Sequence, residues 1–268
     1  MNIAAHCHQQ SIALCTALLA AAIFAAPCQL AMAEMRFERT YVGSVAGIPI
    51  GEGVWTITID DKDYAMRATG RVTGLLGWVI PGEGSVAVRG TVRQGRFWAT
   101  NYWVDVKSKK SFTVTMDLNA GTVRDVSIEP PTPPNRKNIP VADADRREVS
   151  DPMSAGIIPV AGAGTVLNAS ACKRTLQIFD GTQRFDLALT FKRMEEVQAD
   201  EGYRGPAVVC GVTYRPIAGY NPNRSTIKYL VADRDIELWL TPVADTRFLM
   251  PYRVSSPTTI GTAVLQAR

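Results

Sequence analysis

The reactions open to this sequence depend first on which reactive side chains the working protein keeps. Both histidines, His6 and His8, lie within the first 33 residues, and no histidine follows them. If that segment is removed on export, a Ser-His-Asp or Cys-His mechanism is excluded, because no histidine remains to act as general base. Ordinary zinc sites are excluded as well, since they need histidine or several free cysteines. We therefore expect no metal and no cofactor.

Two cysteines, Cys172 and Cys210, remain beyond residue 33. They do not form a C-x-x-C motif, which argues against a thioredoxin-type redox role. In an oxidising compartment an even pair predicts a disulfide bond. Closing that loop would stabilise the fold by about 4 kcal/mol in the chain-entropy model. The alternative is a pair of buried, unbonded thiols.

Paired carboxylates are the remaining catalytic option, because a glycosidase needs two acids that face one cleft. The spacing of the acids between residues 60 and 63 does not match a calcium loop, and a polar hairpin tip explains it better. We expect no enzymatic activity, and the alternative is a carboxylate-based hydrolase acting on an envelope polysaccharide. The acids that stand close together are Asp60, Asp61, Asp63, Asp180 and Asp186.

An apolar segment from Gly74 to Gly82 is the strongest candidate for ligand binding. Its large side chains stand among glycines and a proline, which disfavour a regular strand or helix. Large apolar groups at a surface usually mark an interaction site, so we expect them to border an apolar concavity. The alternative is a buried strand crossing. The ligand-binding candidates are Leu75, Leu76, Trp78 and Ile80 of this segment, with the aromatic residues Tyr102, Trp103, Tyr214 and Tyr220.

Four glycines stand close together between residues 43 and 53, at Gly43, Gly47, Gly51 and Gly53. No helical pattern follows them, so they do not indicate a phosphate-binding loop. Turns and strand bends are the expected explanation.

The first 33 residues have the features of a secretory signal peptide. They contain no Lys, Arg, Asp or Glu, and their apolar run, from Ser11 to Ala26, is shorter than the about 20 residues that span a bilayer. The small residues Ala31 and Ala33 predict cleavage between Ala33 and Glu34. We expect a soluble mature chain in the periplasm; the alternatives are a membrane anchor and a lipidated Cys28.

The formal net charge of +4 is mild and is carried by the chain beyond the leader. The densest basic groups are Lys107, Lys109 and Lys110, and the pair Arg146 and Arg147. Groups this small do not predict nucleic-acid binding. Solvated surface is the simpler interpretation.

Short alternating stretches that end in turn residues predict a mainly β fold. A strand set this large curls, so we expect a curled antiparallel sheet, a half-barrel or β-spiral, in a single domain over residues 34–268. One short helix is expected, capped by Ser150 or Asp151 and ending near Val160. The proline-rich stretch 129–141 is a surface connector or a junction between subdomains. The main expected strands are 53–59, 64–72, 85–92, 96–106, 111–118, 123–128, 174–179, 183–192, 207–214, 226–231, 235–241, 248–254 and 258–265.

Several motifs together resemble an exported proteobacterial domain family of unknown function. This resemblance spans nearly all of the chain beyond the leader. It implies a periplasmic protein with a curled antiparallel sheet, similar to half-barrel lipoprotein carriers or spiral-shaped envelope-integrity proteins, and it implies no established catalytic residues. The motifs are Gly51-Glu52-Gly53, Gly74-Leu75-Leu76-Gly77, Gly121-Thr122-Val123, Asp151-Pro152-Met153-Ser154-Ala155, Phe179 to Leu187 and Cys210 to Tyr220.

These features favour a non-catalytic binding or scaffolding protein of the cell envelope. One form of this hypothesis places an apolar ligand such as a lipid in the curl of the sheet. The other places an envelope protein partner on a sheet edge or on the proline connector. Nothing in the sequence indicates an oligomeric state.

Overall fold

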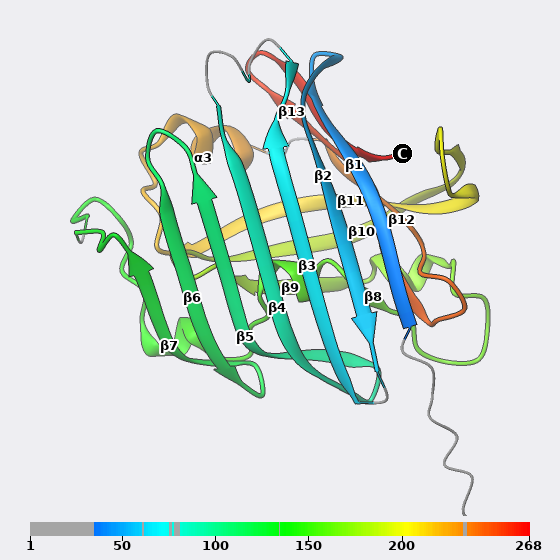
Figure 1. Ribbon diagram of the computed structural model, residues 1–268, viewed down its shortest axis with the longest axis horizontal. Helices are drawn as coiled ribbons and strands as arrows, with labels where there is room; N and C mark the ends of the chain where they lie inside the picture. Colours follow the sequence, from blue (N-terminus) through cyan, green and yellow to red (C-terminus); the bar gives the residue numbers. More distant parts are fainter. Residues whose placement is uncertain (1–34, 61, 75–76, 78–80, 134, 233–234) are drawn as a thin grey trace, which may run out of the picture. The chain divides into compact units, whose positions relative to one another are not determined.

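All strands of the described chain belong to one antiparallel sheet that does not close. The computed structural model describes residues 35–60, 62–74, 77, 81–133, 135–232 and 235–268. The sheet has 14 strands in the order β7-β6-β5-β4-β3-β2-β1-β14-β13-β12-β11-β10-β9, and the short strand β8 (Ile158–Pro159) pairs with β13 (Figure 1). Its two outermost strands are therefore β7 and β9.

The sheet consists of two meanders. They meet where β1 pairs with β14, from Tyr41 opposite Ala267 to Val45 opposite Ala263. The first meander is β1 (Met35–Val45), β2 (Ile48–Ile59), β3 (Asp63–Val72), β4 (Glu83–Arg93), β5 (Arg96–Lys107), β6 (Phe112–Asn119) and β7 (Thr122–Glu129). The second is β9 (Arg174–Phe179), β10 (Arg184–Gln198), β11 (Arg204–Ala218), β12 (Ile236–Pro242), β13 (Phe248–Thr258) and β14 (Gly261–Ala267).

The sheet curls strongly between its two edges. Strands β10 and β11 run across the view at a steep angle to β3–β6 in Figure 1. A large sheet of twisted strands adopts such a curl because the twist accumulates from one strand to the next. The predicted fold class, mainly β with a curled antiparallel sheet, is confirmed.

The described helices are few and short. They are α2 (Pro152–Ala155), α3 (Ser225–Leu230) and the 3₁₀ helices η1 (Asp143–Arg146) and η2 (Ala169–Cys172). Among the described residues, no helix has the length and apolar character needed to cross a membrane.

Two predicted elements differ from the structure. The helix after Ser150 ends at Ala155 rather than near Val160, because Ile158–Pro159 form β8 and pair with Phe248–Leu249 of β13. The predicted strand 226–231 is instead the helix α3. The helix satisfies its backbone groups within the segment: the amide of Val231 donates to the carbonyl of Ile227 and that of Lys228 to the carbonyl of Arg224, both at 3.0 Å.

The segment that follows the proline connector fills the curl of the sheet. Val149 and Ile157 pack in one core cluster with Ile57, Met66 and Met116 of the first meander. The amide of Val149 donates to the carbonyl of Gly121 (2.9 Å), and the amide of Ser150 donates to the carbonyl of Gln177 (2.9 Å). This segment therefore connects the β6–β7 turn with β9.

A second core cluster surrounds the disulfide bond. Cys172 of η2 and Cys210 of β11 are bonded, with their Cα atoms 5.4 Å apart, which confirms the predicted pairing. The bond joins the connection before β9 to the middle of the second meander. The buried residues of this cluster are Ile158, Val160, Ala171, Cys172, Leu189, Val208, Cys210, Leu240 and Leu249.

Candidate ligand-binding site

A row of glycines crosses three neighbouring strands near one end of the first meander. Gly53 of β2 lies opposite Gly70 of β3, and Gly70 lies opposite Gly84 of β4. Directly paired residues of antiparallel strands face the same side of a sheet, so these three positions leave one face bare. The residue opposite Gly53 on β1 is Tyr41, and two residues farther along these strands Gly43 lies opposite Gly51 on the same face.

The same face carries large side chains farther along these strands. Ile57, Met66 and Val88 are paired across β2, β3 and β4 and are at most 2% exposed. The glycine positions, which leave the face bare, are therefore confined to one end of the strands.

Two of these glycines are also required by the backbone. A Cβ atom at Gly53 would lie 2.6 Å from the carbonyl oxygen of Thr69, and one at Gly51 would lie 2.9 Å from that of Arg71. The approach of β2 to β3 is thus too close for any other residue. At Gly84 the nearest atom to an added Cβ would be 3.7 Å away, so this position has room for a side chain.

The glycine row opens into a concavity of about 750 Å³. This volume lies within the roughly 300–1,000 Å³ typical of small-molecule sites. Its walls come from both meanders, because Pro251 and β13–β14 residues face the first strands across it. The larger apolar side chains around it are Tyr41, Ile50, Trp55, Ala68, Val72, Val86, Val106, Met153, Pro251, Val254 and Leu265.

The helix α2 supplies part of this lining through Met153. Asp151 caps the helix: its Oδ1 accepts hydrogen bonds from the amides of Met153 and Ser154, both 2.9 Å long. The Ser154 hydroxyl is hydrogen-bonded to the Tyr64 hydroxyl of β3 at 2.7 Å. Burial raises the pKa of the Asp151 carboxyl above its ordinary value. These contacts hold Met153 beside the concavity.

The charged residues beside the glycine row point away from it. Glu52, Arg71, Glu83 and Lys107 are paired in that order across β2 to β5. They alternate with the inward glycines, so their side chains lie on the opposite face. There Arg71 pairs with Glu52 (2.6 Å) and Lys107 with Glu83 (3.3 Å). The side chains that face the concavity from these strands are therefore uncharged.

The Tyr41 hydroxyl is already engaged in a hydrogen bond. It donates to the carbonyl oxygen of Pro251 at 2.6 Å, and burial raises the pKa of Tyr41 to about 12. The phenol thus stays neutral at physiological pH and is bonded within the protein. A ligand in the concavity would meet mostly apolar surface.

The sequence-based ligand candidates lie in several places. Leu75, Leu76, Trp78 and Ile80 lie outside the described residues, while Val72, Pro81 and Gly82 on either side of them line the concavity. Ala33 and Glu34, the expected cleavage site, also lie outside the described residues.

The four aromatic candidates do not line the concavity. Tyr102 is buried in the main core, and Trp103, its neighbour on β5, points to the other face. The ring of Tyr214 lies 5.6 Å from that of Phe185, and the carbonyl of Tyr220 accepts a hydrogen bond from the amide of Ile139.

The sequence analysis missed the glycine row as a site. Of the four early glycines, Gly47 does lie in a turn, with φ of 79°, but Gly43, Gly51 and Gly53 lie inside strands. The available signal was the spacing of glycines: Gly51 and Gly53, and again Gly82 and Gly84, are two residues apart, which is the spacing of residues that face the same side of a strand.

The acids considered for catalysis have structural partners. Asp180 accepts hydrogen bonds from the amides of Thr182 and Gln183 in the β9–β10 turn, and Asp186 pairs with Arg184. Asp60 and Asp63 lie at the β2–β3 connection, and Asp61 is outside the described residues. Nowhere in the described part of the chain do three or more His, Cys, Asp or Glu side chains gather as they would around a metal ion.

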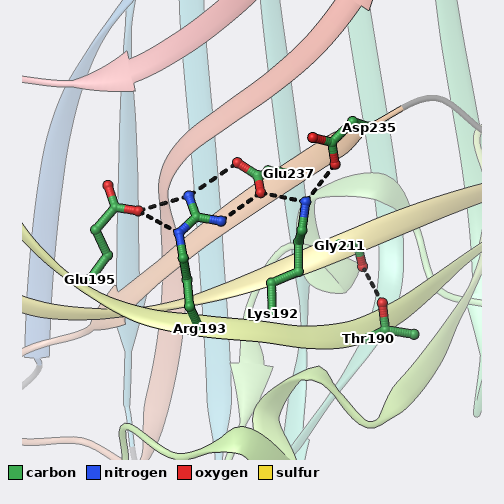
Figure 2. A network of polar contacts seen from close by, with 7 residues as sticks. All are labelled: Thr190, Lys192, Arg193, Glu195, Gly211, Asp235 and Glu237. Atoms are coloured by element: carbon green, nitrogen blue, oxygen red, sulfur yellow. Dashed lines mark hydrogen bonds and ion pairs between the residues drawn. The ribbon is translucent and has the colours of Figure 1, made fainter.

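A network of charged side chains lies on the second meander (Figure 2). This network depends on a β-bulge in β10. Phe191 lies opposite Cys210 and Arg193 opposite Val209, so Lys192 is an extra residue with no residue opposite it on β11. Consecutive residues Lys192 and Arg193 can therefore both reach Glu237 of β12, each at 2.7 Å. Figure 2 shows both cations extending toward that carboxylate.

Glu237 is the centre of this network. Hydrogen bonds from Arg193, followed by those from Lys192, lower the pKa of Glu237 to about 2. Arg193 also pairs with Glu195, and Lys192 with Asp235. Every charge in the network has an opposite partner, so it joins β10 to β12 without leaving a free catalytic group.

Comparison with known proteins gives a family and a distant structural similarity. The chain is similar to a solved beta-barrel-like protein of the domain of unknown function DUF1849 from Brucella abortus, with 10% identity, a TM-score of 0.47, and coverage of 88% of this chain and 95% of that chain. No curated protein matches. The family model for a protein of unknown function, DUF3108, matches residues 36–268. This chain therefore belongs to the DUF3108 family.

Proposed function

We propose that this protein is a non-catalytic binding protein of the cell envelope that holds an apolar ligand in the glycine-lined concavity. The observation that carries the proposal is the row Gly53–Gly70–Gly84, which hollows the inward face of a sheet that is otherwise filled with large side chains.

An unfilled hollow of this kind is unfavourable for the protein alone. Protein interiors are close-packed, and apolar surface left in water forgoes about 25 cal/mol for each Å² that could be buried. Gly84 has room for a side chain that would fill part of the space, yet none is present. A ligand that covers Trp55, Val86 and Val254 would recover this lost burial.

The chemistry of the lining indicates the class of ligand. Glu52, Arg71 and Glu83 border the concavity, but strand alternation directs their side chains to the opposite face, and the Tyr41 hydroxyl is bonded to Pro251. Such walls favour an acyl chain or a similar hydrocarbon group over a sugar or a peptide backbone, whose polar groups would lose hydrogen bonds to water on entry.

The proposed location is the periplasm. Its support is the leader-like first 33 residues together with the Cys172–Cys210 disulfide bond, since such bonds persist in oxidising compartments. An exported protein with an apolar concavity suits the transport or storage of a lipid between membranes.

Filling the concavity tests the proposal. In Gly84→Val the new methyl groups enter the hollow next to Val106, and we expect binding of a fluorescent fatty acid to weaken at least tenfold while the melting temperature stays equal or rises. The matched control is Gly164→Val, because an added Cβ at Gly164 meets nothing within 4 Å and Gly164 does not line the concavity.

Native mass spectrometry of the exported protein provides the second measurement. We expect a co-purified lipid in the parent protein and in Gly164→Val, and its loss in Gly84→Val. The proposal would be contradicted if the parent protein did not bind fatty acid, or if Gly84→Val and Gly164→Val bound it equally well.

A further inference from the structure

Three hairpin connections gather at the open end of the concavity. They are the β1–β2, β5–β6 and β13–β14 connections, at residues 46–47, 108–111 and 259–260. The amide of Ala46 donates to the carbonyl of Thr262 (2.9 Å), which joins the first connection to the third. Ser108, at the start of the second, lines the concavity together with Gly43 and Ile50.

This end of the sheet exposes apolar side chains. Ile260, at 75% exposed, and Ile48, at 66%, are the two most exposed large hydrophobic residues in the described part of the chain. Both lie at the tips of the joined hairpins. Phe112, at the start of β6, is a further exposed apolar residue at the β5–β6 connection. Large apolar side chains clustered at one surface usually mark a contact with a partner or a membrane.

The three connections themselves carry lysines and no acids. Lys109 and Lys110 stand exposed in the β5–β6 connection, and no Asp or Glu occurs in residues 44–50, 107–116 or 255–265. The nearest acids of the glycine row, Glu52 and Glu83, are paired with Arg71 and Lys107. The β2–β3 connection at the other end of the same strands differs, because Asp60 and Asp63 flank Lys62 there.

We propose that Ile48, Ile260, Lys109 and Lys110 form a surface, here called the mouth surface, that contacts an anionic lipid bilayer. Apolar tips enter the boundary between headgroups and acyl chains, and lysines beside them are attracted to lipid phosphates. Charge complementarity selects this partner, since the connections combine exposed isoleucines with lysines and carry no acid, and the acids on neighbouring strand ends are paired with cations. The inference concerns the outer tips of the hairpins and does not depend on what fills the concavity.

Vesicle co-sedimentation of the exported protein tests the mouth surface. The vesicles are phosphatidylcholine alone, or phosphatidylcholine with one third phosphatidylglycerol. We expect binding to the anionic vesicles only, and weaker binding as salt is added. Lys109→Gln/Lys110→Gln should weaken it by roughly fivefold for each lysine. Ile48→Ser/Ile260→Ser should weaken it by about tenfold or more, since inserted isoleucine side chains are lost.

Matched controls lie away from the mouth surface. Lys62→Gln/Arg93→Gln removes two cations at the opposite end of β2–β4, and Ile217→Ser removes an isoleucine that is 41% exposed on β11. Both should bind anionic vesicles as the parent protein does. All variants should keep the melting temperature and the fatty-acid binding of the parent, so a failure here is separate from a failure of the proposed ligand site.

Several outcomes would overturn the inference. They are no binding of the parent protein to anionic vesicles, equal binding to neutral vesicles, or an equal loss in the control variants. Sedimentation velocity without vesicles tests a further outcome. If the parent protein is a dimer and Ile48→Ser/Ile260→Ser dissociates it, the mouth surface contacts a second copy of the chain instead of a bilayer.

Discussion

The hydroxyl groups of Tyr64 and Ser154 lie 2.7 Å apart, although the two residues are 90 positions apart in the chain. Tyr64 belongs to β3, and Ser154 to the helix α2 inside the curl. Both side chains are buried, with 3% and 4% exposed. This contact fixes the helix against the sheet, and with it the position of Met153 beside the concavity.

Tyr64→Phe should therefore destabilise the protein and loosen the ligand site. Removing one hydroxyl leaves that of Ser154 buried with one partner fewer, at a cost of about 1–3 kcal/mol. Urea unfolding measures this loss. Ser154→Ala and the double variant complete a cycle, and we expect the double variant to cost less than the sum of the single changes. Strict additivity would show that the two hydroxyls do not interact.

Removing the disulfide bond should reduce stability more than any change at the surface. Cys172→Ser/Cys210→Ser opens a loop between residues 38 positions apart, and native bonds of this kind are worth roughly 2–5 kcal/mol. Chemical denaturation of the variant and of the reduced parent protein should give the same loss. Thiol titration of the unfolded, oxidised mature protein should find no free cysteine, and two reactive thiols would refute the bond.

The charged network on β10 and β12 predicts a specific pH dependence. The folded-state pKa of Glu237 is lowered to about 2, whereas an unfolded glutamate has a pKa of about 4.3. Its contribution to stability is therefore present above about pH 4.3 and is lost as the pH falls toward 2. We expect the melting temperature of the parent protein to fall more steeply over this window than that of Glu237→Gln.

The comparison with Glu237→Gln is needed because the pKa of another acid, Asp151, is shifted in the opposite direction. Burial raises the pKa of Asp151, so its contribution to stability is lost as the pH rises. Asp151 is unchanged in both proteins, and the difference between their melting curves isolates Glu237. Parallel curves between pH 4.3 and 2 would contradict the predicted role of the network.

Much of the sheet could be predicted from the sequence because its signals are local. The alternation in 53–59 and 64–72 and the turn residues between them specify β2 and β3, and Asp180-Gly181 marks the turn between β9 and β10. The cap at Asp151 is equally local, and the structure shows it. Such features depend on a few neighbouring residues.

The elements that were wrong or missed depend on distant partners. Residues 226–231 have strand-like composition but form the helix α3, and in the described chain only β10 pairs with β11 beyond Val212. The bulge at Lys192 interrupts an alternation that looks regular in the sequence. The concavity depends on the register that aligns Gly53, Gly70 and Gly84, and no single strand reveals that alignment.

The apolar segment between β3 and β4 gives the last prediction, through Trp78. This residue lies outside the described part of the chain, and the prediction rests on its sequence neighbours Val72, Pro81 and Gly82, which line the concavity. If Trp78 helps to cover a bound ligand, Trp78→Ala should weaken fatty-acid binding and co-purification of lipid, with little change in melting temperature. If Trp78 is a core residue, the same change should cost about 3–5 kcal/mol of stability. Trp103→Ala is the matched control, since Trp103 does not line the concavity. A large fall in the melting temperature of Trp78→Ala, with lipid binding unchanged, would assign Trp78 to the core and leave ligand binding to the glycine row alone.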